Sequence, residues 1–436
     1  MSWLAGKNDV PARRKGIVTV LDVGSSKVCC IVARLRPADE GQLLRGRTHN
    51  IQVIGIGHQK SQGVKSGVVV DLDRAEQSIR LAVDAAERTA GITVDSLFAN
   101  VSAGRLRSET FQATVKLGGH EVDASDVERV RAAGTKQALR AERQVVHSLP
   151  VAFSLDSERG VRDPRGMVGE TLGVDMHVLT GDSAPLRNLE LSINRAHLTV
   201  ERMVATPYAS GLAALVDDEL EMGAACIDMG GGTTTIAVFS EGKFVYADAL
   251  AIGGNHVTMD LARGLSTRLE DAERLKVMHG SILPGLSDER DIVSYQPIGS
   301  DETDPPAQIP RSVMSRIIRA RVEETLEMLR DRLNKSGFSS AVGKRVVLTG
   351  GASQLAGLPE AARRILGRNA RIGRPLGVAG LPEAAKGPAF SAAVGLMVYP
   401  QTASFENRSR GKLTPMRVTG TGGRMNRVSQ WLKESF

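Results

Sequence analysis

The sequence lacks long apolar runs and is poor in cysteine. No run approaches the ~20 apolar residues that a membrane-spanning helix needs, and the first residues, MSWLAGKNDVPARRKG, lack the apolar core of a signal peptide. We therefore expect a cytoplasmic protein. Its three cysteines, Cys29, Cys30 and Cys226, form a poor disulfide or metal framework because the number is odd and two are adjacent. They lie in apolar, strand-like runs, which indicates core packing.

The body of the chain also lacks net charge. The total is +7, yet residues 401–436 carry +5 and residues 1–15 carry +3, which leaves −1 for the rest. A protein that wraps nucleic acid needs a basic face on the fold itself, so we expect no nucleic-acid partner. Adhesion of the basic ends to an anionic membrane is the favoured interpretation, and DNA binding by the basic tail is a weaker alternative.

What the sequence does contain is a repeated strand-turn-strand pattern. A hydrophobic fraction of 42% over 436 residues supports two or more packed lobes. IVTVLDVGSSKVCCIVARL predicts strands over 17–22 and 27–35 around a tight turn. AACIDMGGGTTTIAVFSEGKFVYADAL repeats this arrangement 206 residues later and adds a third strand. Two such units indicate an α/β fold with a duplicated lobe.

The segments between these units have their own patterns. Apolar residues three and four apart predict helices over 72–90 and 312–333. Strand-like runs around a short helix near Ser125 predict a small α+β insertion between about 94 and 172. A third glycine turn follows a strand over 345–349 and opens a helix through Ser353.

Two of the glycine turns carry groups that bind phosphate. The turns would grip a triphosphate from both sides, through backbone N–H groups, hydroxyls and an ammonium group. Carboxylates facing phosphate make sense only if Mg²⁺ lies between them, through water, and Asp22 and Asp228 would hold it. The two turns contribute Asp22, Gly24, Ser25, Ser26 and Lys27, and Asp228, Gly230, Gly231, Gly232, Thr233 and Thr234.

The third turn offers flat backbone on which a purine could lie, at Gly350, Gly351, Ala352 and Ser353. A single glycine-rich hairpin is more often structural than functional. Two matched Asp-x-Gly turns followed by TGGAS rarely arise by chance in this order. The combination therefore predicts one nucleotide site built from three turns.

These motifs carry a family resemblance. LDVGSSK, IDMGGGTT and LTGGAS resemble the two phosphate motifs and the adenosine motif of the actin, sugar-kinase and heat-shock-chaperone superfamily. Within it the chain is most similar to the FtsA family, over residues 17–399 and again at the C-terminal helix. The similarity includes GVVVDLDRAEQSIRLAVDAAE, DAERLKVMHG, IGRPLGVAGL and FSAAVGLMVY.

The resemblance implies an actin-like fold of two ribonuclease-H-like lobes, with a small SHS2-like α+β subdomain inserted in the first. It further implies ATP contacts at Gly253, Gly254 and Asn255, and contacts to ribose or base from Glu273 and Lys276. The last two are three apart, so one helical face presents both. A solvated helix face is the alternative for this pair.

The domain boundaries follow from the same resemblance. We expect a disordered extension (1–16), a first-lobe core (17–93, 173–222 and 381–400), the insertion (94–172), a second-lobe core (223–259 and 312–380), a small second-lobe subdomain (260–311), a disordered linker (401–423) and an amphipathic helix (424–436).

Hydrolysis of ATP should be weak. Phosphoryl transfer to water needs a polar residue that orients the attacking water. The related chaperones use a Glu-Pro pair, whereas this chain has Thr206 before Pro207, and a neutral hydroxyl is a poor substitute. We expect at most a slow ATPase that serves mainly as a scaffold. No base for a sugar-kinase reaction can be placed.

The last twelve residues, MNRVSQWLKESF, predict a helix that lies in a membrane interface. At ~100° per residue its apolar side chains share one arc, flanked by two basic residues. Docking on its own domain is the alternative, but the resemblance implies a membrane-targeting helix here. The apolar residues are Met425, Val428, Trp431, Leu432 and Phe436, and the basic residues are Arg427 and Lys433.

The resemblance also implies the partners. Residues 260–311 should receive the C-terminal peptide of FtsZ, with basic side chains at Arg263, Arg268, Arg274 and Lys276. The chain should form a filament with itself at the inner membrane of the division septum, and the insertion should contact later division proteins. A PilM-like pilus or secretion scaffold and a small-molecule kinase of the same fold are the alternatives.

Overall fold

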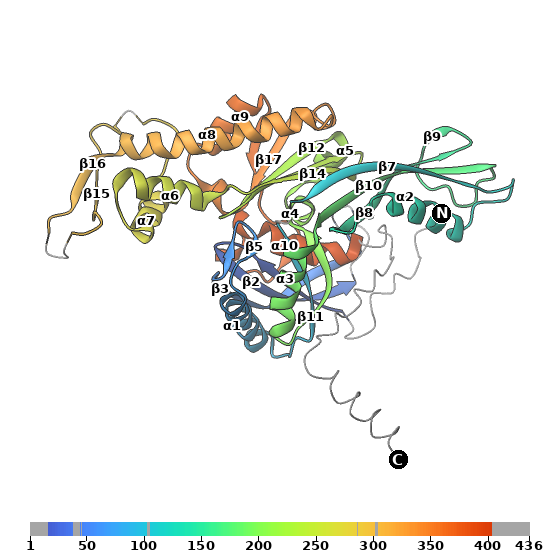
Figure 1. Cartoon of the computed structure of the whole chain (residues 1–436), viewed down its shortest axis with the longest axis horizontal. Helices are drawn as coiled ribbons and strands as arrows, with labels where there is room; N and C mark the ends of the chain where they lie inside the picture. Colours follow the sequence, from blue (N-terminus) through green and yellow to red (C-terminus); the bar gives the residue numbers. More distant parts are fainter. Residues whose placement is uncertain are drawn as a thin grey trace, which may run out of the picture.

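The computed structural model describes residues 16–37, 44, 46–102, 105–285, 287–300 and 304–402. Two α/β lobes are stacked, with the second lobe above the first in Figure 1. The extension before Gly16 and the predicted amphipathic helix lie outside the described residues. Among the described helices, none is both long and apolar enough to cross a membrane.

The first lobe is built on a six-stranded sheet in the order β11-β6-β1-β2-β3-β19. β1, β2 and β3 are antiparallel, whereas β6 and β11 run parallel to β1 and to each other. The predicted strands over 17–22 and 27–35 are confirmed. The six strands are β1 (Ile17–Val23), β2 (Lys27–Pro37), β3 (His49–Lys60), β6 (Ser96–Val101), β11 (Thr199–Ala205) and β19 (Val378–Ala379).

The second lobe repeats this arrangement in a five-stranded sheet, β14-β13-β12-β17-β18. Three antiparallel strands are again followed by two parallel strands. The duplication expected from the sequence is therefore confirmed. The strands are β12 (Ala224–Met229), β13 (Thr234–Ser240), β14 (Lys243–Leu250), β17 (Arg345–Thr349) and β18 (Asn369–Ile372).

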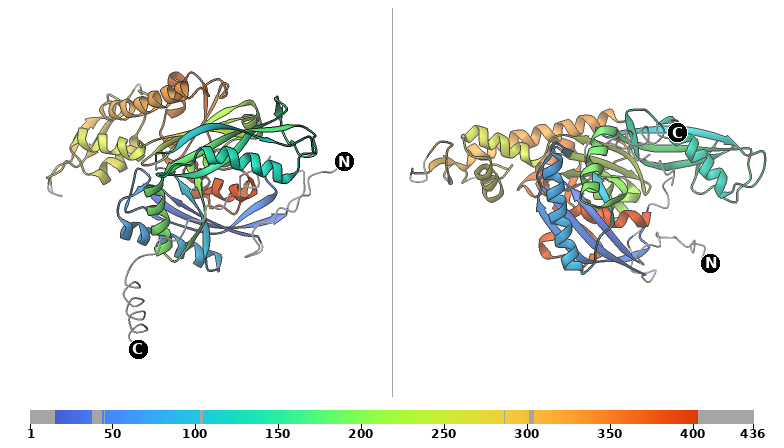
Figure 2. Two further views of the ribbon diagram at one scale, coloured as in Figure 1. Left: turned by 45° about the vertical axis from the view of Figure 1, so that its right-hand side comes forward. Right: turned by 60° about the horizontal axis from the view of Figure 1, so that its bottom comes forward.

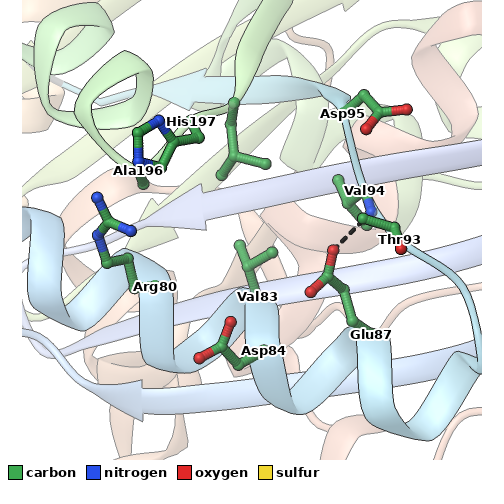
Figure 3. A pocket seen from close by; sticks show the side chains of 10 residues that line it. Arg80, Val83, Asp84, Glu87, Thr93, Val94, Asp95, Ala196 and His197 are labelled. Carbon is green, nitrogen blue, oxygen red and sulfur yellow. Dashed lines mark hydrogen bonds between the residues drawn. The ribbon is translucent and has the colours of Figure 1, made fainter.

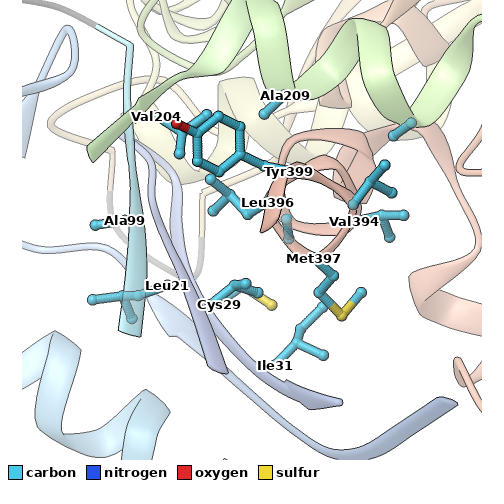
Figure 4. Close-up of a cluster of buried hydrophobic side chains, with 14 of the residues drawn as sticks. Leu21, Cys29, Ile31, Ala99, Val204, Ala209, Val394, Leu396, Met397 and Tyr399 are labelled. Atoms are coloured by element: carbon cyan, nitrogen blue, oxygen red, sulfur yellow. The ribbon is translucent and has the colours of Figure 1, made fainter. Parts of the chain in front are cut away.

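Two helices fill the space between the first-lobe sheet and the second lobe. α10 (Ser391–Thr402) is almost entirely buried against β1, β2 and α4 (Thr206–Ala214), as Figure 4 shows around Leu396, Met397 and Tyr399. The backbones of α4 and α10 approach so closely that a Cβ on Gly395 would collide with the Ala209 carbonyl oxygen. The core around this crossing contains residues of both lobes, whereas the second lobe also has a separate core of its own.

Most of the other helices cover the outer faces of the two sheets, whereas α7 packs on α6 and β15. α1 begins at the capping Asp71, whose carboxylate accepts the Arg74 N–H, and ends at the left-handed Gly91. The predicted helices over 72–90 and 312–333 are confirmed as α1 and α8. The helices are α1 (Leu72–Ala90), α3 (Ser183–Arg195), α5 (Asp217–Met222), α6 (Gly254–Leu265), α7 (Leu269–His279), α8 (Arg311–Lys335) and α9 (Leu358–Leu366), with short hairpins β4 (Val64–Lys65) to β5 (Val68–Val69) and β15 (Ile292–Tyr295) to β16 (Ala307–Pro310).

The insertion is a four-stranded sheet, β7-β10-β8-β9, with α2 (Ala124–Gln137) packed on one face. It has its own apolar core around Val130, Leu172 and Met176. It lies at the opposite end of the molecule from the β15–β16 hairpin (Figures 1 and 2). The strands are β7 (Arg107–Lys116), β8 (Arg143–Leu155), β9 (Glu158–Val161) and β10 (Thr171–Asp182).

Several predicted boundaries are wrong. The insertion cannot begin at residue 94, because β6 pairs with β1 in the first-lobe sheet, and it cannot end at residue 172, because β10 continues to Asp182. β19 returns the chain to the first-lobe sheet before residue 381. Ser353 lies in a 3₁₀ turn, Gly351–Gln354, and the α-helix begins only at Leu358.

The linker also starts later than expected, since α10 continues to Thr402. Gln401 is buried there, and its side-chain oxygen accepts the N–H groups of Thr48 and His49. Beyond Thr402 the linker lies outside the described residues. The prediction that the three cysteines pack in the core is confirmed, because all three are free and buried.

Candidate functional site

The first predicted phosphate turn joins β1 to β2 and is closed by a hydrogen bond from Gly24 N–H to the Lys27 carbonyl (3.0 Å). Asp22 is buried at the end of β1. Asn100 of β6 donates its amide N–H to Asp22 Oδ1 (2.7 Å), and Asn100 Oδ1 accepts the Val23 N–H (2.7 Å). We did not predict Asn100. Its only signal in the sequence is a single amide in the apolar strand SLFANV.

The Lys27 side chain contacts Ala389 and Phe390, beside the third turn. Its ammonium group donates to the Ala389 carbonyl (2.5 Å) and lies 3.2 Å from the centre of the Phe390 ring. Burial lowers the pKa of Lys27, although Asp22 opposes this effect. In this arrangement Lys27 therefore joins the first turn to the segment beside the third turn.

The second turn, between β12 and β13, is closed in the same way, by Gly230 N–H and the Thr233 carbonyl (2.9 Å). Ser210 of α4 donates its hydroxyl to Asp228 Oδ2. We did not predict Ser210 either. It lies four residues after Thr206, on the same face of α4. Thr234 is turned aside, since its hydroxyl donates to the Ile252 carbonyl (2.8 Å).

The first and second turns lie directly against each other. A Cβ on Gly231 would collide with the Ser26 hydroxyl, and one on Gly232 would collide with the Ser25 hydroxyl. Ser26 also donates to Asn255 Oδ1 (3.2 Å), at the start of α6. Groups from both lobes thus meet at one point, and only glycine allows this approach.

The two carboxylates make this point electrically unusual. Burial raises the pKa of Asp22 to about 6, with Lys27 lowering it and Asp228 raising it further. Burial also raises the pKa of Asp228, against the hydrogen bond from Ser210. Two desolvated carboxylates that repel each other form a donor set suited to a hard divalent cation.

A buried hydroxyl beside them supports the same fit. Thr235 pairs directly with Asp228 across β12 and β13, so the two side chains share a face of the sheet. Its Oγ1 is buried without a hydrogen-bond partner among the described residues. No group of three or more His, Cys, Asp or Glu side chains is placed to hold a metal in that part of the chain. A cation here would therefore depend on two carboxylates and additional oxygen ligands.

The third turn meets the start of α6, where the adenosine contacts were expected. Gly254 N–H donates to the Gly230 carbonyl (2.9 Å), and Asn255 N–H donates to the Gly231 carbonyl (2.7 Å). A Cβ on Gly254 would lie 3.2 Å from the Ala352 side chain. The Ser353 hydroxyl is turned back onto the Gly350 carbonyl (2.7 Å). The structure thus brings Gly254 beside Ala352, whereas Gly253 lies against Gly230 and Gly231 of the second turn.

Lys276 joins this group from α7. Its ammonium group donates to the Gly254 carbonyl (3.2 Å) and the Thr258 hydroxyl (2.9 Å), and it pairs with Glu273 (2.6 Å). The Lys276 side chain is only 14% exposed. The alternative of a solvated helix face is therefore wrong for Lys276, whereas Glu273 remains half exposed.

A separate cavity of about 340 Å³ lies in the first lobe, away from the three turns. Figure 3 shows Arg80, Asp84 and Glu87 of α1 facing Asp95 and His197 across it. Glu87 accepts the Val94 N–H (2.6 Å) at its edge. None of the predicted nucleotide contacts lines this cavity. The predicted membrane residues, 425–436, lie outside the described part of the chain.

Known proteins resemble this chain over nearly all of its length. The family model described as "Cell division protein FtsA" matches residues 225–395, and that described as "SHS2 domain inserted in FTSA" matches residues 103–180. The cell division protein FtsA of Rhizobium meliloti (strain 1021) is 65% identical over 427 residues, which cover 98% of this chain and 96% of the relative. The chain belongs to the FtsA family.

More distant relatives agree. FtsA of Pseudomonas aeruginosa is 31% identical, with 96% of this chain and 98% of the relative covered. A solved "PilM-PilN type IV pilus biogenesis complex" is 17% identical with a TM-score of 0.60, covering 88% of this chain and 98% of that chain. The latter shows the fold alone. The expected FtsA family membership, the actin-like fold and the SHS2 insertion are confirmed.

Proposed function

We propose that this member of the FtsA family binds Mg²⁺ and ATP between its lobes. The observation that carries the proposal is the direct contact of two matched turns, Ser25–Ser26 from one lobe and Gly231–Gly232 from the other. Backbone N–H groups and hydroxyls of these turns would hold the phosphates. Asp22 and Asp228 would hold the cation through water, which would stabilise both carboxylates in their charged forms.

The base and ribose would lie between the third turn and the start of α6. Gly350, Ala352 and Gly254 supply surface with little side chain, and Lys276 and Glu273 border it. Lys276 now holds the Gly254 carbonyl, so a bound nucleoside would replace that contact. Lys27 would exchange the Ala389 carbonyl for phosphate, because phosphate is the stronger acceptor.

Hydrolysis would be slow. Thr206, the first residue of α4, is buried, and its hydroxyl accepts the Asn100 amide N–H (3.2 Å). It is neutral and already engaged, so it activates water poorly. We expect turnover well below ~1 s⁻¹, the low end of ordinary enzyme rates. The chain would act as an ATP-dependent scaffold rather than as an enzyme.

The scaffold would hold FtsZ filaments to the cytoplasmic face of the inner membrane at the division septum. The FtsZ peptide would bind the small subdomain of the second lobe, where a groove of about 190 Å³ is lined by Arg274, Leu275 and Tyr295. Val277 and Met278 of α7 are 72% and 67% exposed, which suits the apolar part of a peptide. Lys276 points inward, so Arg263, Arg268 and Arg274 would supply the basic contacts.

Self-assembly would make membrane attachment firm. The insertion lies at the opposite end of the molecule from the small second-lobe subdomain, which suits contacts from one subunit to the next and to later division proteins. One amphipathic helix (424–436) gives weak, reversible binding to anionic lipid. A filament multiplies these helices and converts weak binding into avidity.

The test combines FtsZ, anionic liposomes and the full chain, with and without Mg·ATP. The intact chain should carry FtsZ to the vesicles, and the chain without residues 425–436 should not. Gln430→Ala, on the polar side of the predicted helix, is the matched control for Trp431→Ala. If the shortened chain gathers FtsZ on vesicles as well as the intact chain does, the anchoring proposal is wrong. A small-molecule kinase of the same fold would instead show substrate-dependent ADP release that loss of residues 424–436 leaves unchanged.

A further inference from the structure

Helix α4 contacts the networks of both carboxylates. Its first residue, Thr206, accepts the Asn100 amide N–H (3.2 Å), and the same amide nitrogen donates to Asp22. One helical turn later, Ser210 donates to Asp228. A nine-residue helix is thus hydrogen-bonded, directly or through one side chain, to the phosphate turn of each lobe.

A side chain of α4 between these two contacts reaches the insertion. The Tyr208 ring stacks on Phe244 of β14, with ring centres 4.6 Å apart and planes 9° from parallel. It also meets His147 of β8 edge-on at 5.1 Å. His147 Nε2 accepts the Ala205 N–H (2.8 Å), immediately before α4. Tyr208 therefore lies where the two lobes and the insertion meet.

The insertion also makes polar contacts with the second lobe beside this ring. His177 of β10 bonds the Phe244 carbonyl through Nδ1 (3.0 Å) and the Ser108 hydroxyl through Nε2 (2.6 Å). Ser108 in turn accepts the Ala247 N–H (3.3 Å). Burial lowers the pKa of His177 to about 4, so the imidazole is neutral at physiological pH. Hydrogen bonds therefore tie the insertion to β14, so a movement of β14 would move the insertion with it.

The surroundings of α4 leave it little room to adjust. A Cβ on Gly211 would collide with the Phe239 ring, and a Cβ on Gly395 would collide with the Ala209 carbonyl. Tightly packed elements move as units instead of deforming. A displacement of α4 would therefore be passed to whatever its side chains contact.

We infer that α4 couples the state of the nucleotide cleft to the placement of the inserted subdomain, with Tyr208 as the positioning residue that makes the link. The inference rests on the proposed nucleotide binding. A cation between Asp22 and Asp228 changes what the Asn100 amide and the Ser210 hydroxyl bond to. Because both groups bear on α4, ligand binding favours one position of the helix over another. Tyr208 transfers that preference to His147 and Phe244, and through them to β8.

The coupling is reciprocal, as any linkage between two sites must be. A partner that fixes the insertion in the nucleotide-bound position strengthens nucleotide binding by the same factor. The usual range of such couplings is about 5-fold to 150-fold. A partner bound at the insertion would therefore change the affinity for nucleotide, and bound nucleotide would change the affinity for that partner.

The test is hydrogen exchange of the full chain with and without Mg·ATP, alongside direct titration with a fluorescent ATP analogue. In the unmodified chain, Mg·ATP should change exchange in β8 and β10 at least about fivefold. Tyr208→Leu should abolish that response while changing ATP affinity less than about threefold. Tyr208→Phe, which keeps the ring, should retain it.

Tyr246→Leu is the matched control, because Tyr246 lies on β14 but stacks on Phe338 of the second lobe (5.5 Å). It should leave the response intact. If Tyr208→Leu does not fold, as judged by circular dichroism, His147→Gln carries the test, since glutamine can still accept the Ala205 N–H but lacks the ring. It should likewise lose the response.

The failures are distinguishable. If ATP binds but exchange in the insertion does not change, the coupling is wrong and the proposed ATP site stands. The same holds if exchange changes equally in the unmodified chain and in Tyr208→Leu, or in His147→Gln where that variant is used instead. If the unmodified chain binds no ATP, both proposals are overturned.

Discussion

The two lobes have the same strand succession but hold their carboxylates by different means. Asp22 is fixed by Asn100, an amide from a neighbouring strand of its own sheet. Asp228 is fixed by Ser210, a hydroxyl from α4 outside its own sheet. Duplication thus preserved the sheet and the turn, whereas the support of each carboxylate differs. As a result, α4 is hydrogen-bonded to the carboxylate networks of both lobes, through Thr206 and Ser210.

The two supporting residues, Asn100 and Ser210, also differ in how many hydrogen bonds they make. Asn100 makes three hydrogen bonds, to Val23, Asp22 and Thr206, and is 2% exposed. Ser210 makes one bond, to a carboxylate. A group with several buried partners leaves more of them unsatisfied when it is removed. The first-lobe turn should therefore be more sensitive to loss of its support than the second.

Asn100→Ala should give the largest effect. It leaves the Val23 N–H and the Asp22 carboxylate without their partner, at about 2 kcal/mol for each buried group. We expect the free energy of unfolding to fall by about 4 kcal/mol, as measured by urea denaturation. Asn50→Ala, at an exposed position of β3, should cost less than about 0.5 kcal/mol. A loss below about 1 kcal/mol for Asn100→Ala would contradict the comparison.

Asp22→Asn should give the next largest effect, with a sign that depends on pH. The folded pKa of about 6 lies above the usual 3.8, so the folded chain binds more protons than the unfolded chain between these values. Without nucleotide or Mg²⁺, stability should therefore fall as pH rises from 4 to 6 and stay lower above pH 6. The shift corresponds to about 3 kcal/mol at most.

The asparagine variant should reduce this slope without removing it, because burial also raises the pKa of Asp228. It should be the more stable protein at pH 7 in chelator. Urea denaturation at pH 4.5 and pH 7 measures both effects. The same variant should bind Mg·ATP more weakly, since it loses a charged oxygen ligand. Equal slopes in the variant and the unmodified chain would show that Asp22 is not desolvated as described.

Ser210→Ala should cost less, about 1.5–2 kcal/mol, because one hydrogen bond to a charged acceptor is lost. Ser287→Ala is the matched control, since Ser287 donates to Asp291 (2.8 Å) in the same pairing at an exposed position. That change should cost less than about 0.5 kcal/mol. If Ser210→Ala proves as costly as Asn100→Ala, the two lobes depend equally on their supports, contrary to the comparison.

The sequence predicted the parts of this site that local patterns encode. Strand, glycine turn and strand are neighbours in the chain, so both glycine turns could be predicted, and the short helix near Ser125 is confirmed as α2. Asn100 and Ser210 were missed because their importance comes from residues 78 and 18 positions away. One polar residue in an apolar element gives no indication of its partner.

The boundaries of the insertion failed for a related reason. β6 and β10 read as strands, but sequence alone does not say which sheet a strand joins. β6 pairs with β1 and β11, whereas β10 pairs with β7 and β8. Strand pairing is a long-range property, so the local pattern indicated that an insertion exists but not at which strand it begins and ends. The contact of Lys27 with Phe390 could not be predicted for the same reason, because Phe390 is distant in sequence.

The smallest effect should come from the surface contact between the lobes. Lys60 of β3 faces Glu270 of α7 at 3.8 Å, with side chains 79% and 86% exposed. Exposed pairs of this kind are worth about 0.2–1 kcal/mol, and salt screens them. A double-mutant cycle of Lys60→Ala and Glu270→Ala, measured by urea denaturation, should give a coupling below about 0.5 kcal/mol at 0.15 M salt and none at 1 M.

Lys65→Ala, at another exposed position of the first lobe, is the control for loss of positive charge. A weak coupling would mean that the buried contacts of α4 and α10 hold the lobes together, so that separating Lys60 from Glu270 costs little. A coupling above about 1.5 kcal/mol that survives high salt would instead make the rim a lock between the lobes. In that case the Lys60–Glu270 pair would resist separation of the lobes more than the difference between Asn100 and Ser210 does.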